Sequence, residues 1–283
     1  MALVTLKEML TRAQAEKYAV AMFDVFNLEM LQGVMNAAEK LNSPVIVAYG
    51  EGCEEHTDIR YFSTLVRKMA AMTDIPVVLH WDHANTMSSI RKAIDAGFTS
   101  VMLDASADEY EENIRRTKEV VELCKPLGIS VEAELGHVGD EGVFDVKNYR
   151  YTEPDKAQQF VERTGIDALA VAIGNVHGVY KSEPHINYEI LREIRKTVTV
   201  PLVLHGASGL SEEIIRNAVH EGISKINIFT DLCLAPIDAA KEEKLSFEEI
   251  SYDELTKMSQ KAIQKVAEQK IQLFGSADKA WRA

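Results

Sequence analysis

The chain has 283 residues, of which 46% are hydrophobic and 27% charged, the ordinary mixture of a globular protein. Its formal net charge of −13 argues against a nucleic-acid partner, because phosphate backbones attract basic surfaces. No apolar run approaches the roughly 20 residues that a membrane span needs, so we expect no membrane partner either.

The cysteines and the N-terminus favour a cytoplasmic location. Cys53, Cys124 and Cys233 are odd in number and far apart, which fits a reducing compartment better than a disulfide framework. The first residues, MALVTLKEMLTRAQ, are typical of a short amphipathic helix, and they lack the long apolar core and small-residue cleavage site of a signal peptide.

Short β-rich runs alternate with helical patterns along the whole chain. Near-continuous apolar runs of this kind are typical of buried parallel strands, and they occur at 18–24, 44–49, 75–82, 98–104, 129–135, 168–173, 200–205 and 224–229. Apolar residues at three- and four-residue spacings predict helices at 29–41, 59–72, 87–96, 109–127, 154–163, 188–196 and 211–221. Further helices are expected up to Phe274, with a covering segment at 246–254.

Strand–helix alternation implies a parallel sheet. Eight repeats without a linker or low-complexity segment predict a single α/β domain over residues 1–283, a TIM (β/α)8 barrel with extra C-terminal helices. A doubly wound open sheet is the alternative architecture.

Polar residues gather where the predicted strands end, which is where barrels of this kind carry their chemistry. His83, His177 and His205 follow three different strands and would converge at one mouth of the barrel. Three imidazoles with an open fourth position form a catalytic zinc site. Taken singly, each histidine is better explained by an ordinary hydrogen bond; as a group at strand ends, they favour a metal.

Carboxylates accompany these histidines. Asp82 precedes His83 and can exchange protons beside a divalent cation, although an N-cap for the next helix explains it equally well. Asp104 and Glu134 fit a supporting or alternate metal-binding role, or else satisfy backbone groups inside the barrel. His80, two residues before Asp82, fits a supporting role.

Glycine-rich segments follow strands seven and eight, the recurrent phosphate-binding position in this fold. In segments 206–209 and 227–231, Ser208 and Thr230 offer hydroxyl groups, and Lys181 could supply a positive charge. The sequence therefore favours an anionic, phosphorylated substrate.

These residues lie in longer segments that resemble the class II fructose/tagatose bisphosphate aldolase family. The matching segments are HWDHA (80–84), SVMLDAS (100–106), SVEAELG (130–136), AVAIGNVHGVYK (170–181), PLVLHGASGL (201–210), SKINIFTD (224–231) and FGSADKA (274–280). The resemblance covers nearly the whole chain and implies a lyase, specifically an aldehyde-lyase acting on carbohydrate phosphates, in the form of a divergent ketose-phosphate aldolase.

The resemblance also implies individual roles. It makes His83, His177 and His205 ligands of Zn²⁺, Asp82 the acid/base at the C4 hydroxyl, and Asp104 and Glu134 neighbours of an alternate metal position. The pocket for the dihydroxyacetone phosphate half of the substrate, beside which family members often bind Na⁺ or K⁺, comprises Gly178, Lys181, Gly206, Ala207, Ser208, Asn227, Ile228, Phe229 and Thr230. Family members are commonly homodimers or homotetramers.

The chain departs from the family at four positions. Asp24 stands where the family usually has Asn, and Gly50 where it often has Ser or Thr; both positions face substrate hydroxyls. Glu141, in a loop of altered sequence, is the match for a second catalytic group, the loop glutamate that exchanges protons. Gln260 matches the position of an arginine that holds a distal phosphate.

These departures lead to a hypothesis about the substrate. We expect cleavage of a ketose 1-phosphate without a distal phosphate, such as a longer sugar or sugar acid, to dihydroxyacetone phosphate and an aldehyde. The alternatives are a fructose- or tagatose-1,6-bisphosphate aldolase, another metal-dependent barrel enzyme such as a hydrolase or isomerase, and a non-catalytic sugar-phosphate-binding accessory subunit.

Overall fold

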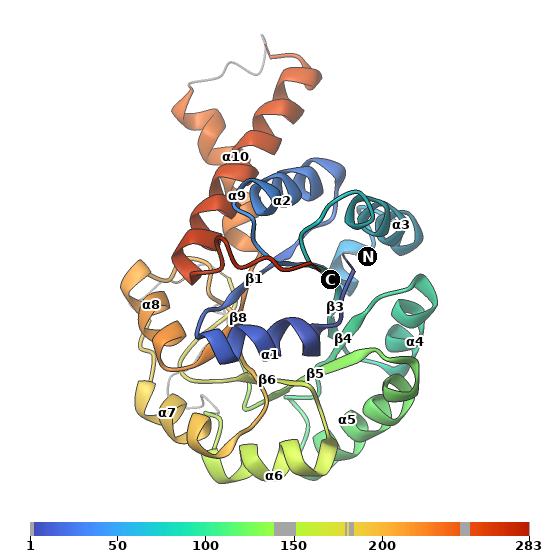
Figure 1. Ribbon diagram of the computed structural model, residues 1–283, viewed down its shortest axis with the longest axis vertical. Helices are drawn as coiled ribbons and strands as arrows, with labels where there is room; N and C mark the ends of the chain where they lie inside the picture. The colour runs from blue at the N-terminus through green and yellow to red at the C-terminus, as the bar shows by residue number, and fades with distance from the viewer. Residues whose placement is uncertain (1–2, 139–150, 179, 181–183, 244–249, 283) are drawn as a thin grey trace.

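The computed structural model describes residues 3–138, 151–178, 180, 184–243 and 250–282. Its centre is a closed barrel of eight parallel strands, each paired with its neighbour in sequence, with β8 closing on β1 (Figure 1). This confirms the predicted TIM barrel and excludes the doubly wound sheet. The strands are β1 (Val20–Asp24), β2 (Val45–Gly50), β3 (Val77–Ala84), β4 (Ser100–Leu103), β5 (Ser130–Leu135), β6 (Ala168–Val171), β7 (Leu202–Leu204) and β8 (Ile223–Ile228).

Helices surround the barrel, and most of them begin at a residue whose side chain caps the first turn, as Asn27 and Asp58 do. The helices are α1 (Leu6–Glu16), α2 (Leu28–Lys40), α3 (Ile59–Ala70), α4 (Met87–Ala96), α5 (Tyr110–Cys124), α6 (Pro154–Thr164), α7 (Tyr188–Thr197), α8 (Glu212–His220), α9 (Thr230–Glu242) and α10 (Tyr252–Phe274), with short 3-10 helices η1 (Glu51–Cys53) and η2 (Lys125–Leu127). Among the described residues, no helix is long and apolar enough to cross a membrane.

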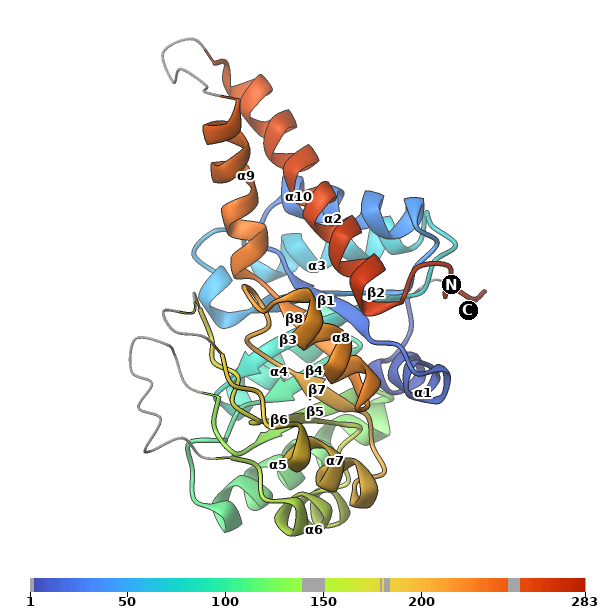
Figure 2. The ribbon, with the colours of Figure 1, turned by 90° about the vertical axis from the view of Figure 1, so that its left-hand side faces the viewer.

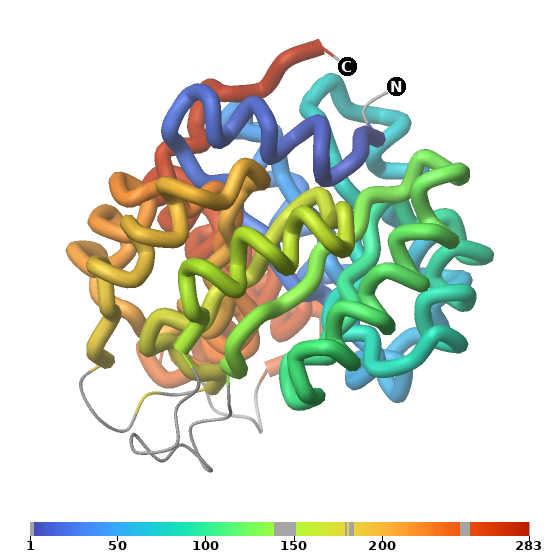
Figure 3. The backbone as a smooth tube through the Cα atoms, turned by 90° about the horizontal axis from the view of Figure 1, so that it is seen from below, coloured from blue at the N-terminus to red at the C-terminus, as the bar shows by residue number. Residues whose placement is uncertain are grey.

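The amphipathic N-terminal helix α1 closes one end of the barrel. Its apolar residues Leu6, Met9 and Leu10 are fully buried and pack against inward-facing strand residues such as Met22 and Val203. In Figure 3, α1 and the last segment of the chain lie on the same side of the molecule. A separate, larger apolar cluster fills the space between the strands and the outer helices.

The C-terminal helices α9 and α10 form an antiparallel pair that extends away from the barrel (Figure 2). Along its length, α10 packs closely on α2, where a Cβ on Gly33 would lie 2.9 Å from the Gln260 carbonyl oxygen. The prediction of helices up to Phe274 is confirmed. Of the predicted covering segment, residues 246–249 lie outside the described residues, and the end of the segment forms the first turn of α10.

Candidate functional site

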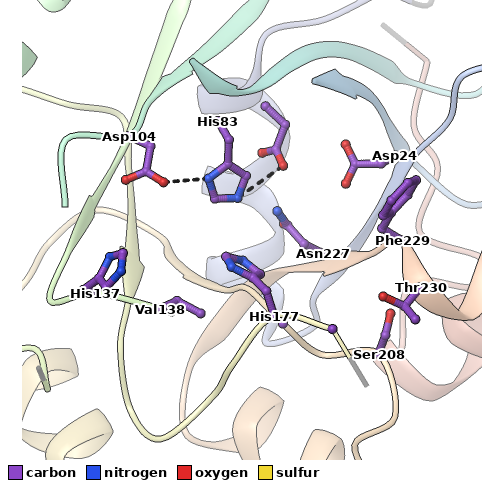
Figure 4. Close-up of a pocket in the computed structure, with 13 residues that line it drawn as sticks. Asp24, His83, Asp104, His137, Val138, His177, Ser208, Asn227, Phe229 and Thr230 are labelled. Carbon is purple, nitrogen blue, oxygen red and sulfur yellow. Dashed lines mark hydrogen bonds and ion pairs between the residues drawn. The ribbon is translucent and has the colours of Figure 1, made fainter. Parts of the chain in front are cut away.

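The candidate site is a cavity of about 360 Å³ at the carboxyl ends of the strands. Figure 4 shows its lining side chains converging from several strands and loops. The lining residues are Asp24, Asp82, His83, Asp104, His137, Val138, His177, Gly178, Gly206, Ser208, Asn227, Phe229 and Thr230. Residues more than 200 positions apart therefore meet in one space, as the strand order predicts.

Three imidazoles meet beside this cavity. The ring centroids of His83 and His177 are 5.1 Å apart, those of His83 and His205 4.8 Å, and those of His177 and His205 5.9 Å. One ring nitrogen from each lies within 4.8 Å of the other two. The predicted metal-ligating histidines are thus brought together, and three imidazole nitrogens are a donor set that suits zinc.

A bulge in β3 turns His83 toward the cavity. The side chains of Val77, Leu79 and Trp81 belong to the outer apolar cluster, so regular alternation would point His83 outward as well. Instead, the pairing with β4 shifts between Trp81 and Ala84, and His83 adopts a left-handed backbone with φ of 49°. Such a conformation costs a non-glycine residue about 1–3 kcal/mol. The bulge allows consecutive Asp82 and His83 side chains to serve the same site.

Carboxylates fix the orientation of two of the rings. Asp104 Oδ2 lies 2.8 Å from His83 Nδ1, which leaves Nε2 of that ring facing the other imidazoles. Glu132 Oε1 lies 3.0 Å from His205 Nε2, which leaves Nδ1 of His205 open. That Nδ1 atom lies 3.3 Å from Glu134 Oε2, and both atoms are buried without a hydrogen-bond partner in the described part of the chain. A cation bound here would satisfy both atoms.

The electrostatics of this cluster also favour a cation. Burial acts to lower the pKa of His83, but Asp82 and the hydrogen bond with Asp104 outweigh it and raise the pKa to about 10. Burial and the two neighbouring imidazoles lower the pKa of His177 to about 4. The carboxylates therefore concentrate negative potential around the rings, while His177 keeps a neutral ring with the free lone pair that metal binding requires.

Asp82 points into the cavity from within β3. Its Oδ1 lies 3.4 Å from His80 Nε2 and its Oδ2 3.5 Å from His83 Nε2. Burial acts to raise the pKa of Asp82, but His83 and His80 lower it well below its usual value. The N-cap alternative is excluded, because the next helix is capped by Thr86. An ionised carboxylate thus stands beside the three imidazoles.

Asp24 lies at the end of β1 and lines the same cavity. Burial and the neighbouring Asp82 carboxylate raise its pKa to about 8. In the unfolded chain an aspartate titrates near pH 4. Between about pH 4 and pH 8 the folded protein therefore holds a proton that the unfolded chain has released, so the stability contributed by Asp24 falls as the pH rises through this window.

Replacing Asp24 by asparagine should therefore stabilise the metal-free protein more at pH 8 than at pH 5. We expect the advantage of Asp24→Asn over the wild type to grow by the order of 1–3 kcal/mol between pH 5 and pH 8. Denaturant unfolding of both metal-free proteins at the two pH values measures this difference. An advantage of equal size at both pH values would contradict the protonated state of Asp24.

Loops after β6 and β7 are held together beneath His177 and His205. Asn175 Nδ2 donates to the His205 carbonyl oxygen at 3.0 Å. The Tyr180 hydroxyl donates to the Gly206 carbonyl oxygen at 2.8 Å and accepts from the backbone N–H of Val176 at 3.1 Å. Only glycine fits at position 206, because a Cβ there would lie 2.0 Å from the Val176 carbonyl oxygen. Gly206 therefore serves loop packing as well as the cavity.

Most of the predicted phosphate-binding residues also line the cavity. Thr230 is the first residue of α9, so the N-terminus of that helix faces the cavity, and helix N-termini attract anions. Ser208 accepts a hydrogen bond from the backbone N–H of Asp231 at 3.3 Å. Neither Ala207 nor Ile228 lines the cavity, because both side chains are buried in the outer apolar cluster.

Other predicted residues lie elsewhere. Gly50 is paired with Asp82 in the sheet but does not line the cavity. Gln260 lies where α10 contacts α2, also outside the cavity lining. Glu141 and Lys181 are outside the described residues.

Sequence reasoning missed two residues that line the cavity, His137 and Val138. His137 Nδ1 lies 2.9 Å from the Ser106 hydroxyl, which in turn donates to Asp104 Oδ1 at 2.7 Å. Its position in the sequence could have identified His137 as a site residue, because it follows the end of β5 as closely as other candidate residues follow their strands.

Comparisons with known proteins show which family the chain belongs to. The family described as "Fructose-bisphosphate aldolase class-II" matches residues 4–279. The chain is 50% identical over 270 residues to the Escherichia coli (strain K12) protein named "Uncharacterized protein YdjI", covering 95% of this chain and 96% of that protein. It is 39% identical over 290 residues to a "Fructose-bisphosphate aldolase" of Staphylococcus aureus (strain Mu50), covering 99% of this chain and 100% of that protein.

A solved structure is also similar over its whole length. The crystal structure described as the YdjI aldolase from Escherichia coli K12 has a TM-score of 0.90 and 47% sequence identity, covering 99% of this chain and 100% of that one. With its barrel, its three converging histidines and the family match over residues 4–279, the chain belongs to the class II fructose-bisphosphate aldolase family.

Proposed function

We propose that this protein reversibly cleaves a ketose 1-phosphate to dihydroxyacetone phosphate and an aldehyde. The observation that carries the proposal is the meeting of three imidazoles, within 4.8 Å of one another, beside a cavity that also receives a helix N-terminus. His83, His177 and His205 would hold the metal, and their nitrogen ligands favour Zn²⁺. When bound, the cation stabilises the negative charge that develops as the carbon–carbon bond breaks.

The protein residues supply positioning and proton transfer. Asp82 is ionised and faces the cavity, so it can accept the proton of the substrate hydroxyl that becomes the aldehyde oxygen. Asp104 holds the His83 ring through Nδ1. In the condensation direction, Asp82 returns the proton to the new hydroxyl group.

The phosphate is proposed to bind at the end of the cavity formed by the loops after β6, β7 and β8. Gly178, Ser208 and Thr230 line it there, and Thr230 begins α9. Backbone N–H groups and the helix dipole attract anions. Family members often have a monovalent cation, Na⁺ or K⁺, beside the phosphate, and we extend that proposal to this site.

The side chains that line the cavity favour a substrate without a second phosphate. The described residues that line the cavity include no lysine or arginine, whereas Asp24 does line it. A distal phosphate there would meet a carboxyl group instead of a cation. Ketose 1-phosphates of longer sugars or sugar acids are therefore the proposed substrates. The alternative is fructose- or tagatose-1,6-bisphosphate, and the name of the Staphylococcus aureus relative supports a fructose bisphosphate.

A substrate comparison tests this proposal. We expect kcat/KM to be at least about tenfold higher for a ketose 1-phosphate than for the matching 1,6-bisphosphate, a difference of about 1.4 kcal/mol. Release of dihydroxyacetone phosphate, followed with a coupled reductase, gives both values and separates an aldolase from a hydrolase, an isomerase or an inert accessory subunit.

The Asp24→Asn variant is the matched control for this comparison. If Asp24 opposes a distal phosphate, the variant should cleave the bisphosphate faster relative to the 1-phosphate than the wild type does. A wild-type preference for the bisphosphate would contradict the proposed substrate class and leave the aldolase proposal standing. Absence of dihydroxyacetone phosphate with every ketose phosphate would contradict both.

We further propose one barrel domain over residues 1–283 that works in the cytoplasm as a homodimer or homotetramer. The three cysteines are unpaired, which fits a reducing compartment. The pair α9–α10 extends from the barrel and exposes Leu234, Ile237 and Tyr252, as an interface between subunits would. Light scattering from the purified protein tests the oligomer; the mass of a monomer would contradict it.

A further inference from the structure

A lysine lies inside the barrel, below the cavity. Lys225 is in the middle of β8, paired in the sheet with Val20 and Val203, and its side chain is fully buried. It is not among the residues that line the cavity. A substrate carbonyl in the cavity therefore does not reach its amine, which argues against a Schiff-base role.

Lys225 forms a two-point ion pair with Glu132 of β5. Its Nζ lies 3.0 Å from Glu132 Oε1 and 2.9 Å from Oε2, and both side chains are fully inaccessible to solvent. A buried ion pair contributes little net stability, because removing two charges from water offsets their attraction, and apolar residues of similar volume often replace such a pair without loss. Stability alone is therefore a weak explanation for this pair.

Glu132 has a second partner, His205. Glu132 Oε1 lies 3.0 Å from His205 Nε2. An ionised carboxylate only accepts hydrogen bonds, so Nε2 of His205 must carry the proton. The other ring nitrogen, Nδ1, which is buried without a hydrogen-bond partner among the described residues, is then the atom that can offer a lone pair to a metal.

We propose that Lys225 is a positioning residue of the metal centre, which acts through Glu132 to fix the tautomer and orientation of His205. The inference rests on the metal site of the proposed function. The Lys225 ammonium lies within 3.0 Å of both oxygens of Glu132, and this pairing restricts the orientation in which the carboxylate accepts the hydrogen bond of His205. Partners of this kind, one step removed from a metal, raise the metal affinity of histidine ligands.

The arrangement around His83 provides a comparison within the same site. There Asp104 holds Nδ1 of the ring, and Asp104 is in turn held by the hydroxyl and backbone N–H of Ser106. Neutral groups orient that carboxylate, which is itself partly exposed. Glu132 is instead surrounded by the barrel interior, where the buried Lys225 cation compensates its charge.

The test measures metal binding by purified Lys225→Met, whose side chain is similar in length but uncharged. Metal-free proteins are titrated with Zn²⁺ against a chromophoric chelator and with Co²⁺, whose visible spectrum reports ligand geometry. We expect about 10–100-fold weaker Zn²⁺ binding than in the wild type and an altered Co²⁺ spectrum.

Two further variants separate positioning from stability. Val203→Ala truncates an apolar side chain beside Lys225 in the sheet, so it should lower the unfolding temperature and leave metal affinity unchanged. Lys225→Met/Glu132→Gln leaves no unpaired buried charge and keeps an amide oxygen that can accept from His205. Because Lys225 acts through Glu132, the double variant should bind Zn²⁺ no more weakly than Glu132→Gln alone.

The outcomes are distinguishable. Wild-type Zn²⁺ affinity in folded Lys225→Met, or an equal loss in Val203→Ala, overturns this inference and leaves the proposed function intact. If Lys225→Met does not fold, a double variant that binds tenfold more weakly than Glu132→Gln overturns it instead. A wild-type protein that binds no divalent cation overturns the proposed metal site and this inference together.

Discussion

Replacement of Asp82 by alanine should lower kcat by about 10²–10⁴-fold, the usual contribution of a positioned acid/base group. The reason is that its carboxylate faces the cavity between His80 and His83 and has no substitute when truncated. Metal binding and the fold should persist, because the three converging imidazoles that would hold the ion stay in place. The coupled assay for dihydroxyacetone phosphate, metal analysis and thermal unfolding measure the three properties.

The Asp82→Asn variant controls for the loss of side-chain volume in Asp82→Ala. It preserves the size of the side chain and a hydrogen-bonding group near His80, so it should be folded as well as the wild type and as inactive as Asp82→Ala. A kcat within tenfold of the wild type in either variant would remove Asp82 from proton transfer.

Removal of the metal should have an effect of similar size. Chelation is expected to lower the cleavage rate by about 10³-fold or more, corresponding to roughly 4 kcal/mol of lost transition-state stabilisation. Readdition of Zn²⁺ should restore the rate. His177→Ala should show the same loss without chelator, because two imidazoles would remain where three converge.

Lys40→Met offers a control for this experiment, since it breaks only an exposed ion pair with Glu268. Its activity should fall with chelator and return with Zn²⁺ as in the wild type. Full activity in a protein shown by metal analysis to contain no divalent ion would contradict the Lewis-acid mechanism.

The barrel could be predicted because buried parallel strands have a strong sequence signature. Runs such as 18–24 and 200–205 contain the observed β1 and β7, and eight strand–helix repeats favour a barrel over an open sheet. Strand ends were less predictable. Apolar composition favours a run ending at Asp82, whereas β3 continues to Ala84 because pairing with β4 resumes after the bulge.

The candidate site was predictable where strand ends carry polar residues, as at His83, His177 and His205. Its supporting groups were not. The orientation of His83 depends on a bulge that the local sequence does not predict. The role of Lys225 depends on Glu132, which is 93 positions away in the chain. Such contacts follow from the three-dimensional register of the barrel and not from spacing along the sequence.

The position of α1 divides the barrel interior into two halves with different tasks. Around α1 the interior is apolar, with residues such as Ile46 and Val78, whereas the half near the cavity carries charged and polar groups. The apolar residues around α1 therefore contribute stability without supplying a reacting group, because none of them lines the cavity. Substitutions confined to the residues packed beneath α1 can raise the stability of the fold while the reacting groups are left untouched.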